Sequence, residues 1–296
     1  MYLIAGATGY VGGLLADRLV SEGKAVRCLA RSPERAAESV DDRCEIVRGD
    51  VLEPETLGPA LEDVEIAYYL VHSMGRGGDG DFAERDRRGA RNFAEAAAAA
   101  GVERIVYLGG LGEGTSDHLR SRQETAEQLA STGVPLTYFR AAIVIGSGSE
   151  SLRTMAYLVR RLPAMVTPSW TTTKTQPIAA ADVVAYLAGA ADVPESAGRE
   201  IEIGGEEITT YGGLLDLCAE AQGLRPRLRV AVPVLSPTLS SHWIGLVTPV
   251  DAGVAKPLVE GLTTETVVED ESGMKLFDVD PTPIEVAMRE AVDELF

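Results

Sequence analysis

The chain has 296 residues, 45% of them hydrophobic, and 45 acidic against 27 basic residues leave a net charge of −18. Such a balance offers no basic face to phosphates and argues against nucleic-acid binding, and no apolar run reaches the roughly 18 residues that span a bilayer. A strand-like pattern begins at Tyr2 and leaves no room for a signal peptide, so we expect a cytoplasmic protein.

The charged residues and the cysteines narrow the class further. Only four of the basic residues are lysines, which together with the acid excess suggests adaptation to high salt; an ordinary acidic cytoplasmic protein is the alternative. Cys28, Cys44 and Cys218 have no metal-ligand spacing, and an odd count argues against a disulfide framework. Since no other group of ligand residues has such a spacing, we predict no metal site.

Short apolar runs alternate with helical patterns from the start of the chain. Strands are predicted at 2–6, 25–31, 44–50, 65–73, 104–110 and 136–146, with helices at 10–23, from about 33, and at 54–62, 81–101 and 118–132. The strands are mostly apolar without alternation, which indicates a parallel sheet covered on both faces. The predicted fold is α/β, a doubly wound parallel sheet with a smaller C-terminal α+β lobe.

The regular alternation of strand and helix patterns ends after Gly146. Helices are predicted at 150–162, 180–190 and 210–223, strands at 199–205 and 227–234, and an apolar stretch follows at 235–262. We expect residues 1–149 to form the core around the parallel sheet. Residues 150–296 are expected to form mainly the smaller lobe, with 179–204 returning to the core sheet.

The segment "GATGYVGG" at 6–13 follows the first strand and opens the first helix. Its glycines allow a tight turn and a bare backbone, and the helix N-terminus offers free N–H groups to a pyrophosphate. A glycine-rich turn without ligand is the alternative. The predicted dinucleotide contacts in this loop are Gly6, Thr8, Gly9, Tyr10, Val11 and Gly12.

The end of the second strand bears on the choice of dinucleotide. An NAD site usually has an acidic residue there for the ribose 2′-hydroxyl, but this strand ends in Ala30, Arg31 and Ser32. Arg31 and Ser32 therefore favour NADP(H) over NAD, unless Arg31 is an ordinary solvated arginine. Asp50 and Val51, after the third strand, are predicted to contact the adenine; a strand-end cap is the alternative for Asp50.

Several segments together resemble a known family. They include "GATGYVGG", "RIVYLGGLG", "FRAAIVIGSGS", "QPIAAADVVAYLAGA" and "EIGGEEITTYGGLL". Over about residues 1–222 the chain is similar to atypical extended short-chain dehydrogenases/reductases of the NmrA-like, NAD(P)H-binding, epimerase-like kind. The resemblance implies that residues 1–149 form an NADP(H)-binding Rossmann core, with the cofactor across the strand ends. It also implies that residues 150–296 are mainly a substrate lobe, with the substrate in a cleft under it.

The resemblance also implies a serine or threonine near the end of strand five and a Tyr-x-x-x-Lys on the next helix, and here the chain departs from the pattern. Gly109 and Gly110 stand at the strand end, and His118 and Arg122 stand where Tyr and Lys are expected. The i to i+4 spacing puts both on one helix face. His118 could donate a proton near neutral pH, contact a ligand without catalysis, or face solvent; Arg122 can hold a ribose or carboxylate but not relay a proton.

Other candidates lie at neighbouring strand ends. His72 and Ser73 follow strand four and are predicted near the nicotinamide or ribose, against the alternative of a hydrogen-bonded strand-end histidine. Val71, Gly109 and Arg140 complete the predicted cofactor contacts, with Arg140 facing a carboxylate or the nicotinamide amide. Three tyrosines inside strands are expected in the core, namely Tyr68, Tyr69 and Tyr107.

Two functions remain open from the sequence. The leading one is an NADP(H)-dependent oxidoreductase that reduces a small organic substrate by hydride transfer, with the apolar residues 232–262 covering the substrate. The other is a non-catalytic NADP(H)-binding redox sensor or assembly subunit, which the missing Ser, Tyr and Lys favour. A nucleotide-sugar epimerase or dehydratase is weaker, because that chemistry depends on the missing tyrosine.

Overall fold

The computed structural model describes residues 1–72, 82–112, 116–232 and 263–296. Its main feature is a seven-stranded sheet in which every neighbouring pair is parallel, in the order β11-β6-β5-β4-β1-β2-β3. The strands are β1 (Tyr2–Ala5), β2 (Val26–Ala30), β3 (Glu45–Arg48), β4 (Ile66–Tyr69), β5 (Arg104–Gly110), β6 (Leu136–Ala141) and β11 (Glu200–Ile203). This order contains the 3-2-1-4-5-6 arrangement of a Rossmann sheet, so the predicted fold is confirmed.

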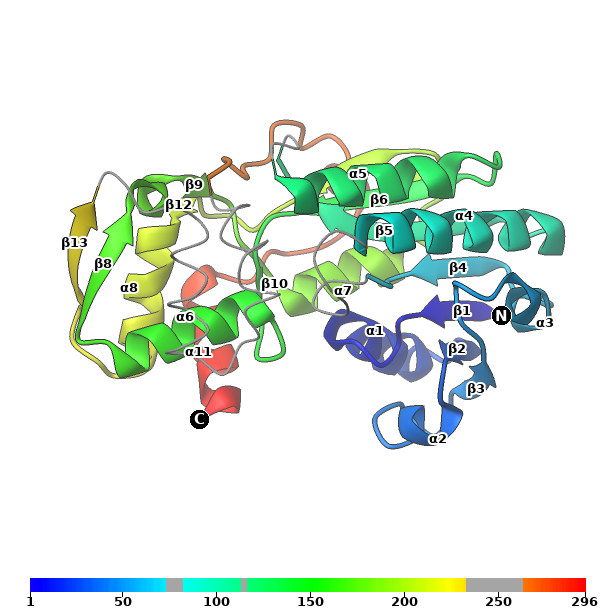
Figure 1. Cartoon of the computed structure of the whole chain (residues 1–296), viewed down its shortest axis with the longest axis horizontal. Helices are drawn as coiled ribbons and strands as arrows, with labels where there is room; N and C mark the ends of the chain where they lie inside the picture. The colour runs from blue at the N-terminus through cyan, green and yellow to red at the C-terminus, as the bar shows by residue number, and fades with distance from the viewer. Residues whose placement is uncertain (73–81, 113–115, 233–262) are drawn as a thin grey trace.

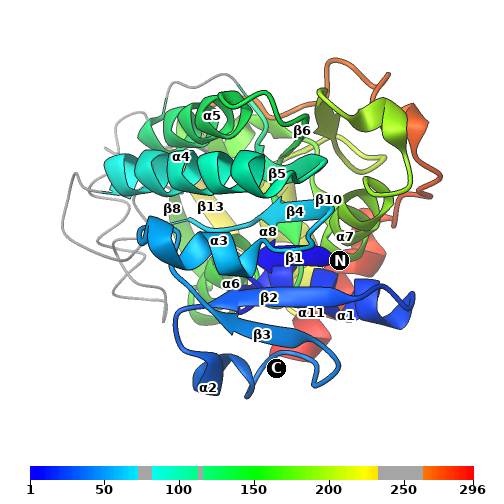
Figure 2. The same ribbon diagram turned by 90° about the vertical axis from the view of Figure 1, so that its right-hand side faces the viewer.

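Helices cover both faces of this sheet (Figures 1 and 2). They are α1 (Tyr10–Ser21), α2 (Pro33–Ala36), α3 (Leu57–Ala60), α4 (Phe82–Ala100), α5 (Asp117–Ala130) and α7 (Ala180–Gly189). One core contains Leu15 of α1 and Leu187 of α7, whereas the core on the opposite face contains Phe93 of α4 and Leu129 of α5. The continuous apolar strands are explained by this burial on both faces.

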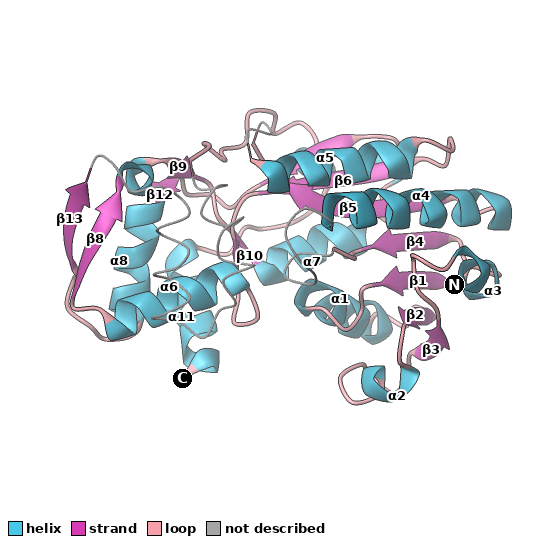
Figure 3. Cartoon of the chain, viewed as in Figure 1, coloured by secondary structure: helices cyan, strands magenta, loops and turns pink. Residues whose placement is uncertain are grey.

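A third core lies beside the carboxyl ends of the strands (Figure 3). It joins α6 (Glu150–Arg161), α8 (Tyr211–Ala221) and α11 (Ile284–Leu295). The short strands around them are β7 (Val144–Ile145), β8 (Ala164–Pro168), β9 (Lys174–Thr175), β10 (Ile178–Ala179), β12 (Thr209–Thr210) and β13 (Leu228–Val232), which pair as β7 with β10, β8 with β13, and β9 with β12.

The chain returns to the main sheet in the middle of this region. Helix α7 packs in the same core as α1, and β11 extends the sheet beyond β6. The predicted division of the chain at residue 149, with the return of residues 179–204 to the core, stays a prediction. Among the described helices, none is long and apolar enough to cross a membrane.

Some predicted elements are shorter or divided. The predicted strand at 136–146 is two strands, because β6 stops where its partner β11 ends and β7 then pairs with β10. The predicted helix at 54–62 is a 3-10 turn, Pro54–Thr56, followed by α3. Helix α11 was not expected, and the apolar stretch 235–262 lies outside the described residues.

Candidate functional site

A cleft of about 1690 Å³ runs along the carboxyl ends of the strands and is lined on its other side by residues of α6 and α8. Twelve of the thirteen predicted cofactor contacts line it, namely Gly6, Thr8, Gly9, Tyr10, Val11, Gly12, Arg31, Ser32, Asp50, Val51, Val71 and Gly109. His72, His118 and Arg122 line it too, whereas Ser73 lies outside the described residues. The fold therefore brings residues from five strand ends to one cavity.

The glycine loop has the geometry of an anion cradle. Gly6 has φ +104°, and a Cβ there would lie 2.6 Å from the carbonyl oxygen of Leu70. A Cβ at Gly12 would lie 2.2 Å from the Gly6 carbonyl oxygen, so neither position accepts a side chain. Gly9 caps α1 without a side-chain hydrogen bond, which leaves the N–H groups of the first turn for an anion. This loop fits a pyrophosphate.

Positive charge gathers at the end of the cleft beyond β2. Arg31 is exposed and follows the strand directly, and Arg35 lies one turn further on α2, which sequence reasoning did not single out. In the described part of the chain, neither guanidinium forms an ion pair with an acidic side chain. Ser32 caps α2, and its Oγ donates to Glu34 at 3.0 Å. Two unpaired arginines at this position suit a 2′-phosphate.

Asp50 and Val51 shape the neighbouring wall. One carboxylate oxygen of Asp50 accepts from the backbone N–H of Leu52 at 2.9 Å, so Asp50 does cap the strand end. It also lines the cleft, and its contact with an adenine stays a prediction. Val51 is buried, and a Cβ at Gly89 would lie 2.9 Å from one of its methyl groups.

His118 and Arg122 lie at the other end of the cleft, one turn apart on α5. The helix begins after Ser116, whose Oγ accepts from the backbone N–H of Leu119 at 3.2 Å. Both side chains are partly buried, and an Arg122 Nη atom donates to the carbonyl of Leu108 at 3.3 Å. The expected shared helix face is therefore turned toward the cleft.

The charge states of this pair differ from the expectation. Burial, the positive charge of Arg122 and the nearby His72 together lower the pKa of His118 to about 3. Burial also disfavours the charge of Arg122, but Tyr107 and Asp86 outweigh it and leave the pKa of Arg122 raised. His118 is thus a neutral imidazole at pH 7. Because its surroundings disfavour the charged form, it does not change protonation near neutral pH as the sequence suggested.

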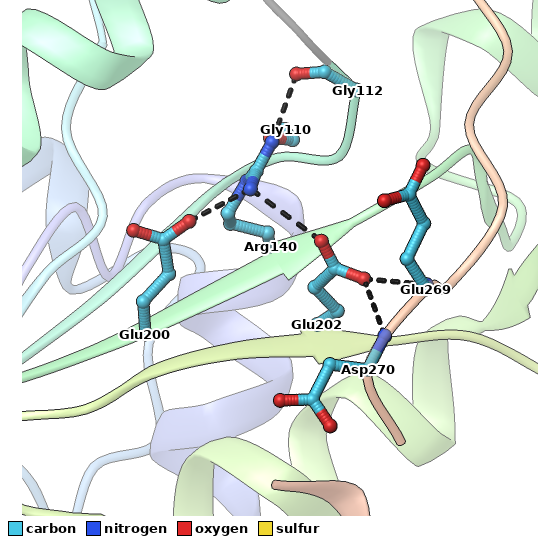
Figure 4. A network of polar contacts seen from close by, with 7 residues as sticks. All are labelled: Gly110, Gly112, Arg140, Glu200, Glu202, Glu269 and Asp270. Atoms are coloured by element: carbon cyan, nitrogen blue, oxygen red, sulfur yellow. Dashed lines mark hydrogen bonds and ion pairs between the residues drawn. The ribbon is translucent and has the colours of Figure 1, made fainter. Parts of the chain in front are cut away.

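Arg140 does not line the cleft, contrary to the prediction. Its guanidinium contacts the carboxylates of Glu200 at 2.7 Å and Glu202 at 3.5 Å and donates to the carbonyls of Gly110 and Gly112 (Figure 4). All of these partners lie on or beside β5 and β11, which flank β6. The arginine is therefore held by the sheet edge instead of facing the cofactor side.

The family model of NAD(P)H-binding proteins matches residues 6–141, the part of the chain that forms the glycine loop and strands β1 to β6. This part of the chain is thus similar to NAD(P)H-binding proteins. The prediction of a nicotinamide dinucleotide is confirmed at this level.

Curated relatives of this chain have different roles. The photosystem II assembly factor Ycf39 of Synechocystis is 32% identical over 36% of this chain and 32% of its own. A (4-alkanoyl-5-oxo-2,5-dihydrofuran-3-yl)methyl phosphate reductase of Streptomyces griseus is 35% identical over 47% of this chain and 46% of its own. The chain thus spans about a third to a half of these two relatives.

A solved structure confirms the fold over the whole chain. The NADPH-dependent quinone oxidoreductase QOR2 of Escherichia coli, complexed with NADPH, superposes with a TM-score of 0.76. The similarity covers 100% of this chain and 99% of that one at 22% sequence identity. At this identity the likeness concerns the fold alone.

A row of buried tyrosines explains why β5 ends in glycines. Tyr69, Tyr107 and Tyr138 are register neighbours on β4, β5 and β6, and all three are buried, as expected for the first two. The rings of Tyr107 and Tyr138 stack at 5.2 Å. A Cβ at Gly109 would lie 2.7 Å from the hydroxyl of Tyr138, so this ring fills the space of a side chain there. Tyr107 in turn donates to the carbonyl of Arg122 at 3.4 Å, which anchors α5.

Some lining residues were not found from the sequence. Asp86 of α4 is 8% exposed and acts electrostatically on Arg122, while Tyr211 and Thr266 reach the cleft from the far side. Asp86 follows Arg85 near the start of a helix, and nothing in the surrounding sequence indicates that its carboxylate is buried. Tyr211 and Thr266 arrive through long-range packing, so no local spacing could identify them.

The low pKa of His118 predicts a pH dependence of stability. The unfolded chain binds a proton at this histidine below about pH 6.5, but the folded chain does so only near pH 3. Stability that is present above pH 6.5 is therefore lost as the pH falls toward 3. Between pH 6.5 and 4.5 the free energy of unfolding should fall by about 2 kcal/mol more in the wild type than in His118→Gln.

Urea denaturation at both pH values measures this difference, and NMR titration of the imidazole measures the pKa directly. Equal pH slopes for the two proteins, or an imidazole that titrates near pH 6.5, would contradict the neutral assignment.

Proposed function

We propose that the protein is an NADP(H)-dependent reductase of a small organic molecule. The observation that carries the proposal is one continuous cleft with two charged ends. Arg31 and Arg35 lie at the end beyond β2, and Arg122 lies with neutral His118 at the end of β5. Tyr211, from α8, lines the same cleft and supplies a surface for a second ligand.

Different residues of the cleft are proposed to bind different parts of the cofactor and the acceptor. The glycine loop holds the pyrophosphate, and Arg31 with Arg35 binds the 2′-phosphate that distinguishes NADP(H) from NAD(H). When bound in this orientation, the cofactor supplies a hydride at the β5 end. Arg122 stabilises negative charge that develops on an acceptor oxygen, since its guanidinium stays charged.

His118 has a role consistent with its charge state. A neutral imidazole donates one N–H hydrogen bond and can orient an acceptor carbonyl without carrying a transferable extra proton. The proton that completes the reduction then comes from solvent, because Arg122 does not release one. His118 is thus proposed as an orienting donor, and His72 as a neighbour that helps to keep it neutral.

A non-catalytic NADP(H)-binding sensor or assembly subunit is the second candidate. The similarity to an assembly factor favours it, and so do the His and Arg in place of the tyrosine and lysine that the family resemblance implies.

One experiment separates the two functions. NADPH absorbance is followed with a panel of quinones, enones and aldehydes, in parallel with NADPH binding by fluorescence. We expect turnover of at least one acceptor class and a fall in kcat of about tenfold to a hundredfold in His118→Ala, which has no side-chain donor, with unchanged NADPH affinity. Binding of NADPH without turnover of any acceptor supports the sensor, and wild-type kcat in His118→Ala removes the role of that histidine.

A further inference from the structure

A single guanidinium at the sheet edge connects separate segments of the chain (Figure 4). Arg140 Nε donates to the carbonyl of Gly110 at 3.3 Å and an Nη atom donates to that of Gly112 at 2.9 Å. Its other Nη contacts Glu200 at 2.7 Å and Glu202 at 3.5 Å. The side chain is only 16% exposed, so its guanidinium faces these partners and not solvent.

Glu202 extends the network to the C-terminal segment 263–270. One carboxylate oxygen faces Arg140, and the other accepts from the backbone N–H groups of Glu269 at 2.7 Å and Asp270 at 3.2 Å. The same view shows both groups of contacts meeting at this carboxylate. Through Glu202, Arg140 therefore holds the C-terminal segment as well as the end of β5.

The two held segments touch and line the cleft together. A Cβ at Gly112 would lie 3.2 Å from the carbonyl oxygen of Glu265. Thr266 hydrogen-bonds through its carbonyl to the backbone N–H of Gln176 at 2.8 Å, and both Gly110 and Thr266 line the cleft. The end of β5 and the C-terminal segment thus form one wall.

The ladder with β6 holds the backbone of β5 as far as Leu111, whose N–H donates to the carbonyl of Ala141 at 2.8 Å. Gly110 and Gly112 have no side chains, and Gly112 has φ +105°, a conformation that favours glycine. His118 follows six residues after Gly112 on α5. A planar guanidinium can hold two carbonyls and a carboxylate at fixed angles, which a lysine ammonium cannot reproduce.

We propose that Arg140 is a positioning residue that holds the end of β5 and the segment 263–270 as one rigid wall of the substrate end of the cleft. The proposal rests on the proposed reductase function for its kinetic consequence. Its structural part, the joint holding of two segments by one side chain, does not depend on that function. Cofactor binding is expected to be independent of Arg140, because the glycine loop and Arg31 lie elsewhere in the cleft.

The test compares Arg140→Lys with wild type by hydrogen exchange and kinetics. We expect the backbone amides near 110–112 and those of 266–270 to exchange about tenfold faster together, since the guanidinium loses its hydrogen bonds to the carbonyls of β5 and its ion pair with the Glu202 that holds the second segment. The KM for the acceptor should rise and kcat/KM should fall about tenfold, with the Kd for NADPH within about twofold of wild type. Glu202→Gln should speed exchange in 266–270 alone, because Arg140 keeps its contacts with β5 and Glu200.

Arg27→Lys is the matched control. Arg27 also bridges a carboxylate, Glu45 at 2.9 Å, and two carbonyls, those of Ala60 and Glu62, but it connects β2 with β3 and with the end of α3. It should leave exchange at 110–112 and 266–270 unchanged.

Three results would overturn the positioning role. They are wild-type exchange in Arg140→Lys, faster exchange in only one of the two segments, and faster exchange with unchanged kcat/KM. If no acceptor is turned over, the reductase function fails, and the exchange measurements alone decide whether Arg140 holds the wall.

Discussion

Gly12→Ala is expected to weaken NADPH binding at least about a hundredfold while the protein stays folded. The added methyl group would lie 2.2 Å from the carbonyl oxygen of Gly6 and 2.8 Å from its carbon. Because these are backbone atoms of the turn itself, relief of the clash requires the loop to open. The N–H groups of the first turn of α1 then no longer converge on the pyrophosphate. Fluorescence titration with NADPH measures the loss, and circular dichroism checks the fold.

The neighbouring glycine provides the control. A Cβ at Gly13 would lie 3.4 Å from the Ala7 carbonyl oxygen, which is ordinary contact. Gly13→Ala should keep NADPH affinity within about twofold and stabilise the fold by about 0.5–1 kcal/mol, because glycine is costly inside a helix. Wild-type affinity in Gly12→Ala would show that the dinucleotide does not use this loop.

Arg31→Ala is expected to raise the Kd for NADPH about tenfold to a hundredfold and to leave the Kd for NADH nearly unchanged. The two dinucleotides differ only in the 2′-phosphate, which Arg31 and Arg35 are proposed to bind. Both side chains are exposed, so salt screens their attraction and the titrations need one low, fixed ionic strength. Arg35→Ala should show the same selectivity with a smaller loss.

Arg48 is the matched control for the loss of one exposed positive charge near this end of the sheet. It ends β3, is exposed and lies 3.8 Å from Glu34, but it does not line the cleft. Arg48→Ala should bind NADPH and NADH as wild type does. Equal losses for both dinucleotides in Arg31→Ala, or no loss for either, would refute the preference for NADP(H).

Local patterns were sufficient for the sheet and the phosphate loop. A buried apolar run before "GATGYVGG" and a helical pattern after it predict β1, the turn and α1 without reference to distant residues. The same holds for the cleft position of Arg31, Asp50 and His118, since parallel strands place all their carboxyl ends at one edge. These predictions depend on chain order and hydrophobic period alone.

The predictions that failed depend on partners far along the chain. Arg140 was predicted to face the cofactor, but Glu200, 60 residues later, holds it at the sheet edge. The division of the 136–146 strand follows from where β11 and β10 pair, again from later segments. Neither pairing has a signal in the residues of β6 itself.

The sequence by itself determined the NAD(P)H-binding core, because strand, turn and helix signals are local and the glycine spacing is specific in that setting. Only the tertiary structure decided what the atypical residues do. It makes His118 neutral through burial beside Arg122, fills the space at Gly109 with the ring of Tyr138, and turns Arg140 into a link between β5 and the C-terminal segment. Charge states and hydrogen bonds of this kind depend on which distant groups fold together, and residue order alone does not contain those distances.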